Sequence, residues 1–457
     1  MEELLERYED MIRNGERVYF DSDEFEDIAD YYDMRENPEA ALNVVEEGLK
    51  QHPGNQNLLL RKIRAFIFNE QYSEASNLIN GLSIDTSDSE VLLLKAEIFL
   101  NTGSVQSGLS MLDLVLEQDD DEYTLLEISD ILKSVEMYDE AMNFLKKGFV
   151  KYPENMDILR EIADNYRSEN NFDAAIEIYN KILDDDPYSA EDWTDLGELF
   201  SLKADYEKAI EAFDFSLTID ESDDRTIFMK GNCYILNGNF EKAIETYHDY
   251  ITFNPTDETP YILIAECYEE MNQYEQAFDY CLSAILASNN SILSLKKMIY
   301  FLMDRECFEE AMEYANKALA ITKKDSNLFF LKADIFTALN KSDEAADYYK
   351  KALAVSTDPN EKNDILFSIG VLKQKEGDDE NALFFFEQIE NNEFIYPDLF
   401  LKMAVSYHET KQYDKCAECL EKTKNEPIDE LSPEEISERE KAIRELTLLL
   451  EETGHRY

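Results

Sequence analysis

The residues best suited to chemistry are few and scattered through the chain. Two cysteines, Cys416 and Cys419, stand three positions apart, and together with His408 they could hold a metal or exchange a disulfide. No second Cys-x-x-Cys pair accompanies them, and each of the four histidines is isolated from the others in the sequence. Cysteine also packs well as a small apolar residue, so a structural role is the favoured interpretation.

The sequence lacks the other familiar motifs of catalysis and cofactor binding. It has no phosphate-binding glycine loop, nucleophile elbow or His-Glu-x-x-His motif. The acidic runs Asp119–Asp121 and Asp184–Asp186 lack the alternating oxygen ligands and the glycine of a calcium loop, so they are interpreted as solvent-exposed turns. We therefore predict no catalytic, cofactor-binding or metal-binding residue, no cofactor and no enzymatic activity.

The elements that would position any site are predicted to be helices. Glycine and proline are scarce in the 457 residues, at 13 and 10, and apolar residues make up 44%. This composition favours helices over strands and turns, and it is apolar enough to form a core. The chain is too long for one ordinary core, so several domains or a repeat array are expected.

Net charge restricts the expected partners. Lys and Arg number 43 against 101 Asp and Glu, which gives a formal charge of -58. Proteins bind nucleic acid and anionic membranes largely through Lys and Arg, so neither is expected as a partner. Residues 1–290 hold 45 of the net negative charges, so a charged ligand should be basic and bind there. The alternative is a self-repelling surface that keeps the protein soluble without implying a partner.

Localisation is predicted from missing signals. The first residues, MEELLERYEDMIRNGERV, lack the basic and apolar regions of a secretory signal, and no stretch approaches about 18 consecutive apolar residues. No membrane insertion is therefore expected. The cysteines are not spaced like a disulfide framework: Cys233, Cys267, Cys281, Cys307, Cys416 and Cys419. A cytoplasmic protein is predicted.

A repeating pattern accounts for most of the chain. Its clearest unit is Ala190–Asp223, with WTDLGELF followed by DYEKAIEAFDFSL. Its landmarks are Trp193, Leu196, Gly197, Phe200, Tyr206, Ala209 and Phe213. This spacing resembles the tetratricopeptide repeat, a helix–turn–helix unit of about 34 residues. Steps of 33 or 34 residues, with one of 37, reach a small residue at the same place in each unit from Ala41 to Cys416.

The resemblance implies an all-α fold, an α-α superhelix of tandem helix–turn–helix repeats wound as a right-handed solenoid. Twelve repeats are predicted within 22–430, with the bounds 22–55, 56–88, 89–121, 122–155, 156–189, 190–223, 224–257, 258–291, 292–325, 326–362, 363–396 and 397–430. Residues 1–21 are predicted to form an N-terminal capping helix, and 431–457 a C-terminal capping helix and tail. Asn14-Gly15 should end the first, and a capping box at Ser432–Glu435 should begin the last.

Packing explains the landmarks without a cofactor. Apolar residues of the first helix, as at Trp193, Leu196 and Phe200, form one buried stripe. Small residues at the twentieth place of each repeat, and at the eighth place of most repeats, let the two helices of a repeat approach closely. The recurring aromatic residues are therefore predicted to be core.

The resemblance also implies where a ligand would bind. In this family the first helices line the inner groove, mainly at the second, fifth, ninth, twelfth and thirteenth places, and the groove holds an extended peptide or a partner's helix. The residues that we assign to a peptide-binding groove on this basis are Glu97, Asp130, Asp157, Arg160, Asp164, Glu191, Thr194, Glu198, Phe228, Asn232, Glu266 and Glu269. Recurring carboxylates favour a ligand bearing Lys or Arg. The alternative is that so acidic a chain places carboxylates on every surface.

One family subtype is not matched. Chaperone-binding members hold a terminal carboxylate with Lys at the fifth place and Asn at the ninth; here only Lys296 stands at a fifth place, and its ninth place is Tyr300. Two local groups of basic residues are expected to form ion pairs with neighbouring acids: Arg61 and Arg64 are one group, and Lys296 and Lys297 are the other.

The sequence therefore predicts a non-catalytic scaffold that binds a protein or peptide, expected to be basic, in its concave groove. One alternative is a structural subunit of a larger complex that uses the convex face or the ends. Another is a regulatory or assembly factor that acts on an enzyme without chemistry of its own. The sequence predicts neither the identity of a partner nor an oligomeric state.

Overall fold

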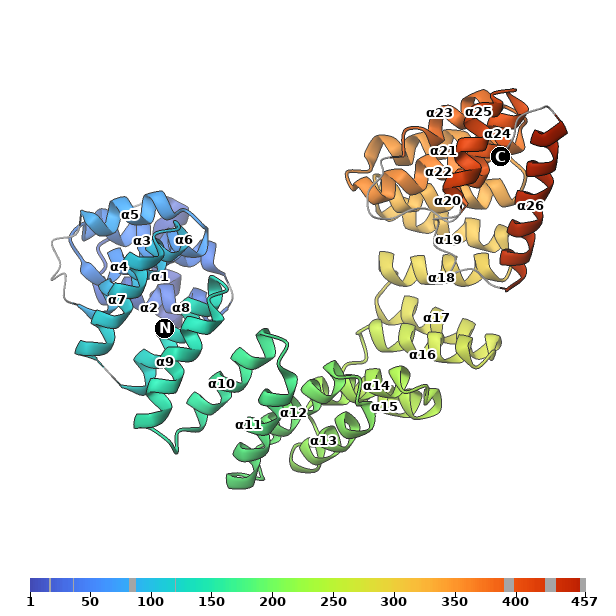
Figure 1. Cartoon of the computed structure of the whole chain (residues 1–457). Coiled ribbons are helices and arrows are strands. Elements are labelled where there is room, and N and C mark those ends of the chain that lie inside the picture. Colours follow the sequence, from blue (N-terminus) through green and yellow to red (C-terminus); the bar gives the residue numbers. More distant parts are fainter. Residues whose placement is uncertain are drawn as a thin grey trace. The chain divides into compact units, whose positions relative to one another are not determined.

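Every described element of the protein, in a computed structural model, is an α-helix (Figure 1). The structure describes residues 1–15, 18–35, 37–81, 88–119, 121–389, 398–423 and 433–452. Helix α1 (Glu2–Asn14) opens the chain, and α26 (Pro433–Glu452) is its last described helix. Between them the helices follow one another as helix–turn–helix hairpins, which confirms the predicted all-α array.

Each hairpin has a first helix with an even number and a second helix with an odd number. The first helices are α2 (Ser22–Asp33), α4 (Gln56–Phe68), α6 (Ser89–Asn101), α8 (Glu122–Ser134), α10 (Met156–Ser168), α12 (Ala190–Leu202), α14 (Asp224–Leu236), α16 (Thr259–Glu270), α18 (Ile292–Asp304), α20 (Ser326–Ala338), α22 (Pro359–Lys375) and α24 (Leu399–Glu409). The second helices are α3 (Pro38–Gln51), α5 (Tyr72–Asn80), α7 (Val105–Gln118), α9 (Tyr138–Lys151), α11 (Phe172–Asp185), α13 (Tyr206–Ile219), α15 (Phe240–Phe253), α17 (Tyr274–Ala287), α19 (Phe308–Ile321), α21 (Ser342–Val355), α23 (Asp379–Phe386) and α25 (Tyr413–Lys422).

The chain divides into two compact units, Met1–Thr226 and Ile227–Tyr457, which we call unit 1 and unit 2. Unit 1 contains α1 to α13 and the start of α14, and unit 2 contains the rest of α14 and α15 to α26. In both units, apolar clusters join one hairpin to the next. In unit 1, for example, Leu112 of α7 packs in one cluster with Ile128 of the following α8. Each unit therefore has a core that continues along its stack of hairpins.

Small residues allow the two helices of a hairpin to pack closely. A Cβ atom added to Gly197 of α12 would lie 2.5 Å from Cε1 of Phe213 in α13, whose side chain is fully buried. The residues at the predicted twentieth place are buried as well: Ala41, Ala75, Gly108, Ala141, Ala175, Ala209, Ala243, Ala277, Ala311, Ala345, Ala382 and Cys416. The predicted packing role of these small residues is confirmed.

In hairpin after hairpin, a residue in the left-handed conformation follows the first helix. Ala204, for instance, has a φ of 58°. The amide N–H of the next residue, Asp205, donates to the carbonyl oxygen of Phe200 at 2.9 Å. This six-to-one hydrogen bond is typical of helix ends with a left-handed residue. Equivalent positive φ angles occur at Glu70, Gly103, Glu136, Asn170, Gly238, Asn272, Glu306, Asn340, Gly377 and Lys411. Only three of these are glycine, so the sequence did not reveal the turn.

Acidic and polar residues between hairpins begin many of the first helices. The side chain of Asp121 accepts a hydrogen bond from the amide of Thr124 at 2.8 Å, which lowers the pKa of the aspartate. Asn155 does the same for the amide of Ile158 at 2.9 Å. Asp121 is thus a helix cap as well as a turn residue, whereas Asp120 lies outside the described residues. The run Asp184–Asp186 is exposed, as predicted.

The helices at the two ends cover the adjoining hairpins, which confirms the predicted capping. Leu5 and Tyr8 of α1 pack into an apolar cluster with residues of α2, α3 and α4. Gly15 ends α1 in a left-handed conformation with a φ of 66°. At the other end, Leu446 and Leu450 of α26 pack against the last hairpin. Ser432 of the predicted capping box lies outside the described residues.

None of the described helices is both long enough and apolar enough to cross a membrane. The cytoplasmic location stays a prediction.

Candidate peptide-binding groove

The predicted groove residues all lie on first helices. In unit 1 the first helices contact one another in sequence, α2 with α4, α4 with α6, α6 with α8 and α8 with α10. In unit 2 the same holds for α18 with α20, α20 with α22 and α22 with α24. We call the surface formed by α2, α4, α6, α8, α10 and α12 the first-helix face of unit 1, and that formed by α16, α18, α20, α22 and α24 the first-helix face of unit 2.

On the first-helix face of unit 1, a bidentate ion pair joins α10 to α12. Arg160 donates from Nε and from a terminal nitrogen to the two carboxylate oxygens of Asp192, at 2.7 and 2.8 Å. The Asp192 side chain is fully buried, and although burial opposes its ionisation, hydrogen bonds from Arg160 and Ser189 lower its pKa. Arg160 also pairs with Asp157 at 2.7 Å. Of the two predicted groove residues, Arg160 therefore forms an ion pair between helices, and Asp157 pairs with it within α10.

Lys133 connects α8 to α10 in the same way. Its Nζ lies 2.5 Å from a carboxylate oxygen of Glu161, 3.3 Å from one of Asp130 and 3.7 Å from one of Asp164. Burial works against the charge of Lys133, but these carboxylates outweigh it and raise the pKa of the amine. The predicted groove residues Asp130 and Asp164 share this cation.

Glu198 is held by two arginines of different helices. Arg167 of α10 lies 3.1 Å from one of its oxygens, and Arg225 at the start of α14 contacts the other. Only 14% of the Glu198 side chain is exposed. Its neighbour Asp195 accepts a hydrogen bond from the hydroxyl of Tyr179 at 2.9 Å, and burial raises the pKa of Asp195. Glu198 is thus neutralised within the protein.

Thr194 does not line an accessible groove, contrary to the prediction. Its side chain is 2% exposed, and its hydroxyl lies 2.8 Å from that of Ser216 and 2.6 Å from that of Thr226. The hydroxyl also donates to the carbonyl oxygen of Ala190 at 3.1 Å. A short polar side chain at the fifth place therefore turns into the core, where this buried network satisfies it.

In unit 2, the two predicted residues of α14 are half-buried beside tyrosines of α15. Asn232 accepts a hydrogen bond from the hydroxyl of Tyr247 at 2.7 Å. The Phe228 ring lies 5.7 Å from the ring of Tyr247 and 5.3 Å from that of Tyr250, centroid to centroid. The tyrosines therefore hold both side chains in place, and packing accounts for Phe228.

Further along unit 2, Lys297 of α18 neutralises the predicted residues of α16. Its Nζ lies 3.3 Å from a carboxylate oxygen of Glu266 and 2.6 Å from one of Glu269. The neighbouring Lys296 pairs with Asp325 at 3.2 Å. Pairing of these two lysines with neighbouring acids was the expectation from the sequence, and it is confirmed.

Two predicted carboxylates differ from the rest. Among the described residues, neither Glu97 of α6 nor Glu191 of α12 has an ion-pair partner. Glu191 is exposed, whereas Glu97 is half-buried. Burial raises the pKa of Glu97, Arg64 partly offsets this shift, and Glu127 adds to it. These two carboxylates are therefore open to a cation from another molecule.

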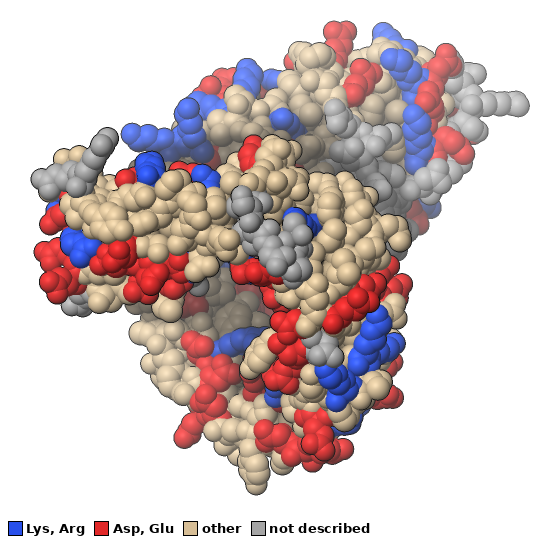
Figure 2. All heavy atoms as spheres, turned by 90° about the vertical axis from the view of Figure 1, so that its left-hand side faces the viewer, with Lys and Arg blue, Asp and Glu red and all other residues tan. Residues whose placement is uncertain are grey.

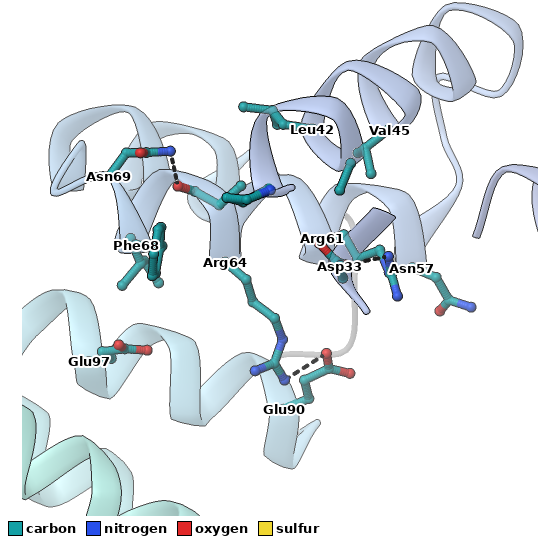
Figure 3. A pocket seen from close by; sticks show the side chains of 14 residues that line it. Asp33, Leu42, Val45, Asn57, Arg61, Arg64, Phe68, Asn69, Glu90 and Glu97 are labelled. Carbon is teal, nitrogen blue, oxygen red and sulfur yellow. Dashed lines mark hydrogen bonds and ion pairs between the residues drawn. The ribbon is translucent and has the colours of Figure 1, made fainter. Parts of the chain in front are cut away.

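Hollows lie along both first-helix faces. One of about 720 Å³ in unit 1 lies among α3, α4 and α6 (Figure 3). A smaller one of about 300 Å³ follows it, and Glu97 lines both. In unit 2 a hollow of about 830 Å³ is lined by residues of α14, α16 and α18, including Glu266 and Glu269. Pockets of this size accommodate side chains of a bound segment.

Acidic side chains exceed basic ones in both units. Residues 1–226 hold 56 acidic and 19 basic side chains, and residues 227–457 hold 45 and 24. On the face of the molecule in Figure 2, acidic side chains form several patches and Lys and Arg lie beside them. The local charge therefore depends on which carboxylates are already paired.

The cysteine pair lies in the apolar core, as its predicted structural role requires. Cys416 and Cys419 are 0% and 5% exposed and belong to the apolar cluster of the last hairpin. Burial raises the pKa of Cys416 to about 12. The His408 ring packs on Tyr413 at 5.7 Å, and the described residues contain no group of three side chains arranged to hold a metal ion.

Sequence reasoning missed the partners of the groove residues, although a signal was present. Asp192 and Glu161 stand outside the predicted groove places, yet each pairs with a cation on the preceding first helix. Arg160 and Asp192 are 32 residues apart in the sequence, and Lys133 and Glu161 are 28 apart. Opposite charges separated by slightly less than one repeat could have indicated these pairs.

The geometry defines a class of protein: an array of α-helical hairpins in which the first helices present a charged, hollowed face. Models of the tetratricopeptide repeat match residues 34–98, 160–224 and 328–362. A model of subunit 3 of the anaphase-promoting complex, or cyclosome, matches residues 203–284. The chain is a tetratricopeptide-repeat protein, and its scaffold is typical of protein–protein interaction.

Known proteins are similar to parts of this chain. A stretch of 65 residues, 14% of the chain, is 37% identical to the photosystem I assembly protein Ycf3 of Rippkaea orientalis (strain PCC 8801 / RF-1), and it spans 38% of that protein. A tetratricopeptide repeat protein from Parabacteroides merdae ATCC 43184 is similar over 55% of this chain and 98% of its own, with 15% identity and a TM-score of 0.41. The hetero-tetramer Cut9–Hcn1 of the anaphase-promoting complex matches over 88% and 90%, with 12% identity and a TM-score of 0.35.

Proposed function

We propose that this protein is a non-catalytic scaffold whose first-helix face in unit 1 binds a basic segment of another protein. The observation that carries the proposal is the distribution of charge on that face. Lys133, Arg160 and Arg167 are already paired with carboxylates, while Glu97 and Glu191 have no cationic partner in the part of the chain that the structure describes. A basic segment would gain from the unpaired carboxylates, and an acidic one would meet repulsion.

We also propose that the described hairpins from α2 to α25 are the twelve repeats predicted from the sequence. The recurring left-handed turn supports this division, because it stands at the fifteenth place of eleven of the predicted windows. The fifteenth place of the first window, residue 36, lies outside the described residues. Within each unit, such a stack of hairpins would offer a series of sites for an extended segment.

A photocrosslinking experiment tests the proposed function. A photoreactive amino acid would replace Glu191 on the first-helix face, and in a separate sample it would replace Glu211 on the outer side of α13, where the side chain is also exposed. Each protein would be incubated with cell lysate at low and high salt, and crosslinked segments would be identified by mass spectrometry. We expect crosslinks from position 191 to segments rich in Lys and Arg, and fewer of them at high salt.

A second candidate function is a structural or assembly subunit of a larger complex that uses the second helices or the ends. Large apolar side chains are exposed on second helices, with Val150 at 83%, Phe215 at 55% and Leu286 at 73%. The match of residues 203–284 to a subunit of the anaphase-promoting complex is in line with this candidate. Salt-resistant crosslinks from position 211, with none from position 191, would favour it over the groove.

A further inference from the structure

The hollow among α3, α4 and α6 has an apolar side. Leu42 and Val45 of α3 line it, and Phe68 at the end of α4 lines it with 76% of its surface exposed. A phenylalanine this exposed loses contact with water only when another apolar group covers it. The hollow, of about 720 Å³, is large enough to take an apolar side chain of a bound segment.

The other side of the hollow is charged, and its charges do not balance. Arg61 pairs with Asp33 at 3.2 Å, and Arg64 pairs with Glu90 at 3.1 Å. Arg61 also contacts Asp30 and Arg64 also lies 3.7 Å from Glu127, so both guanidinium groups are shared among carboxylates. This leaves Glu97 as the carboxylate of the hollow that has no ion-pair partner among the described residues.

Glu97 and Phe68 face the same part of the hollow. In Figure 3 they lie on one side of the Arg64 side chain, while Glu90 lies on the other side and holds the guanidinium away from Glu97. Glu97 is half-buried, and the like charge of Glu127 lies close to it. An added cation stabilises an unpaired, half-buried carboxylate beside another carboxylate more than it stabilises an exposed carboxylate.

We infer that this hollow is a docking site for a protein segment in which an apolar side chain is followed or preceded closely by Lys or Arg. The apolar side chain packs against Phe68, and the cation pairs with Glu97. The inference rests on the proposed function and assigns part of the segment's sequence. Charge complementarity selects this occupant, because an acidic residue beside the apolar one would be repelled by Glu97.

Peptide selection followed by substitution tests the assignment. The full-length chain would be used to select binders from a phage-displayed library of random twelve-residue peptides, and the enriched peptides would be synthesised with a fluorescent label. Their affinities would be measured by fluorescence anisotropy for the wild type and for the variants Glu97→Gln and Phe68→Ala. The controls are Glu117→Gln and Leu114→Ala on α7, which remove a carboxylate and a large apolar side chain from exposed positions of a second helix.

We expect the enriched peptides to share an apolar residue next to, or one residue away from, Lys or Arg. Glu97→Gln and Phe68→Ala should each weaken binding at least fivefold, and the two controls should change it less than twofold. When the peptide's own cation is replaced by Met, Glu97→Gln should have no further effect, because the interaction is already lost. Circular dichroism and thermal unfolding of each variant verify that the fold is retained.

Two outcomes would overturn the inference in different ways. If peptides are enriched and bind Glu97→Gln and Phe68→Ala as tightly as the wild type, the segment binds elsewhere, and the proposed function stands without this site. If the enriched peptides lack a cation near the apolar residue, the assigned sequence is wrong. Failure to enrich any peptide, together with no crosslink from position 191, would reject both the site and the groove.

Discussion

The ion pair between Arg160 and Asp192 gives the sharpest test of how charge holds neighbouring hairpins together. The change is Arg160→Met, which keeps much of the apolar stem and removes the guanidinium. It leaves the carboxylate of Asp192, which is 0% exposed, without its main partner between α10 and α12. Removing one partner of a buried pair costs about 3–5 kcal/mol. Because 34% of the Arg160 side chain is exposed to water, we expect about 3 kcal/mol.

Native-state hydrogen exchange is the appropriate measurement, because repeat arrays open locally rather than all at once. The free energy of opening would be read from amides of α10, α11 and α12 in wild type and variant. The control is Arg64→Met, since Arg64 pairs with Glu90 at 3.1 Å while both side chains are nearly half exposed. Such a surface pair contributes about 1 kcal/mol or less. A cost for Arg160→Met no larger than that of the control would refute the reasoning.

A second substitution and a pH series separate a lost ion pair from lost packing. Adding Asp192→Leu to Arg160→Met removes the unpaired charge, so most of the stability should return. The pKa of Asp192 is lowered in the native protein, so its ionised form contributes stability above the unfolded value of about 3.9. That contribution is lost as the pH falls through the lowered pKa, and the difference between variant and wild type should shrink in acid. A double variant as unstable as the single one would place the cost in packing.

The remaining predictions concern the core and the turns. Ala204→Gly should stabilise the α12–α13 hairpin by about 1 kcal/mol, because alanine is strained at a φ of 58°. Gly197→Ala should destabilise it by about 1–3 kcal/mol, because the added methyl group would meet Phe213. Hydrogen exchange of α12 and α13 measures both changes in stability, and changes of the same sign would contradict these predictions. Burial raises the pKa of Asp334 to about 6, so this group makes unit 2 less stable as the pH rises from about 4 past 6. Asp334→Asn should reduce the change in stability, measured by urea unfolding, over this pH range. An unchanged pH dependence would be inconsistent with the raised pKa of Asp334. Burial also raises the pKa of Cys281 and Cys416 to about 12, so thiol reagents at pH 8 should modify them far more slowly in the native protein than in urea.

The fold was readable from the sequence because its packing rules act on single positions. A small residue such as Ala209 is needed wherever two helices of a hairpin come close, and the need recurs in every hairpin, so the pattern repeats. The turns were not readable in the same way. The left-handed residue is Ala204 in one hairpin and Glu70 in another, with glycine in only a few. Packing of the flanking helices imposes this conformation, so the residue itself need not favour it.

The site was less readable, because its properties depend on pairs rather than positions. The groove places predicted from the repeat register include Asp164, Glu198 and Glu97, which look alike in the sequence. In the structure the first shares Lys133 and the second is held by Arg167, while Glu97 has no partner among the described residues. Counting carboxylates along a groove therefore overstates the negative charge that a ligand would meet.

This distinction also determines how binding should respond to salt. Paired carboxylates such as Glu198 gain little from a ligand's cation, because a new contact would have to displace Arg167 or Arg225. Only the unpaired carboxylates add favourable charge, and an exposed one such as Glu191 is screened by salt more than the half-buried Glu97. Raising the salt concentration should therefore weaken long-range attraction to the acidic chain while leaving part of the interaction at Glu97. Specificity would then reside in the few carboxylates that the scaffold leaves unpaired.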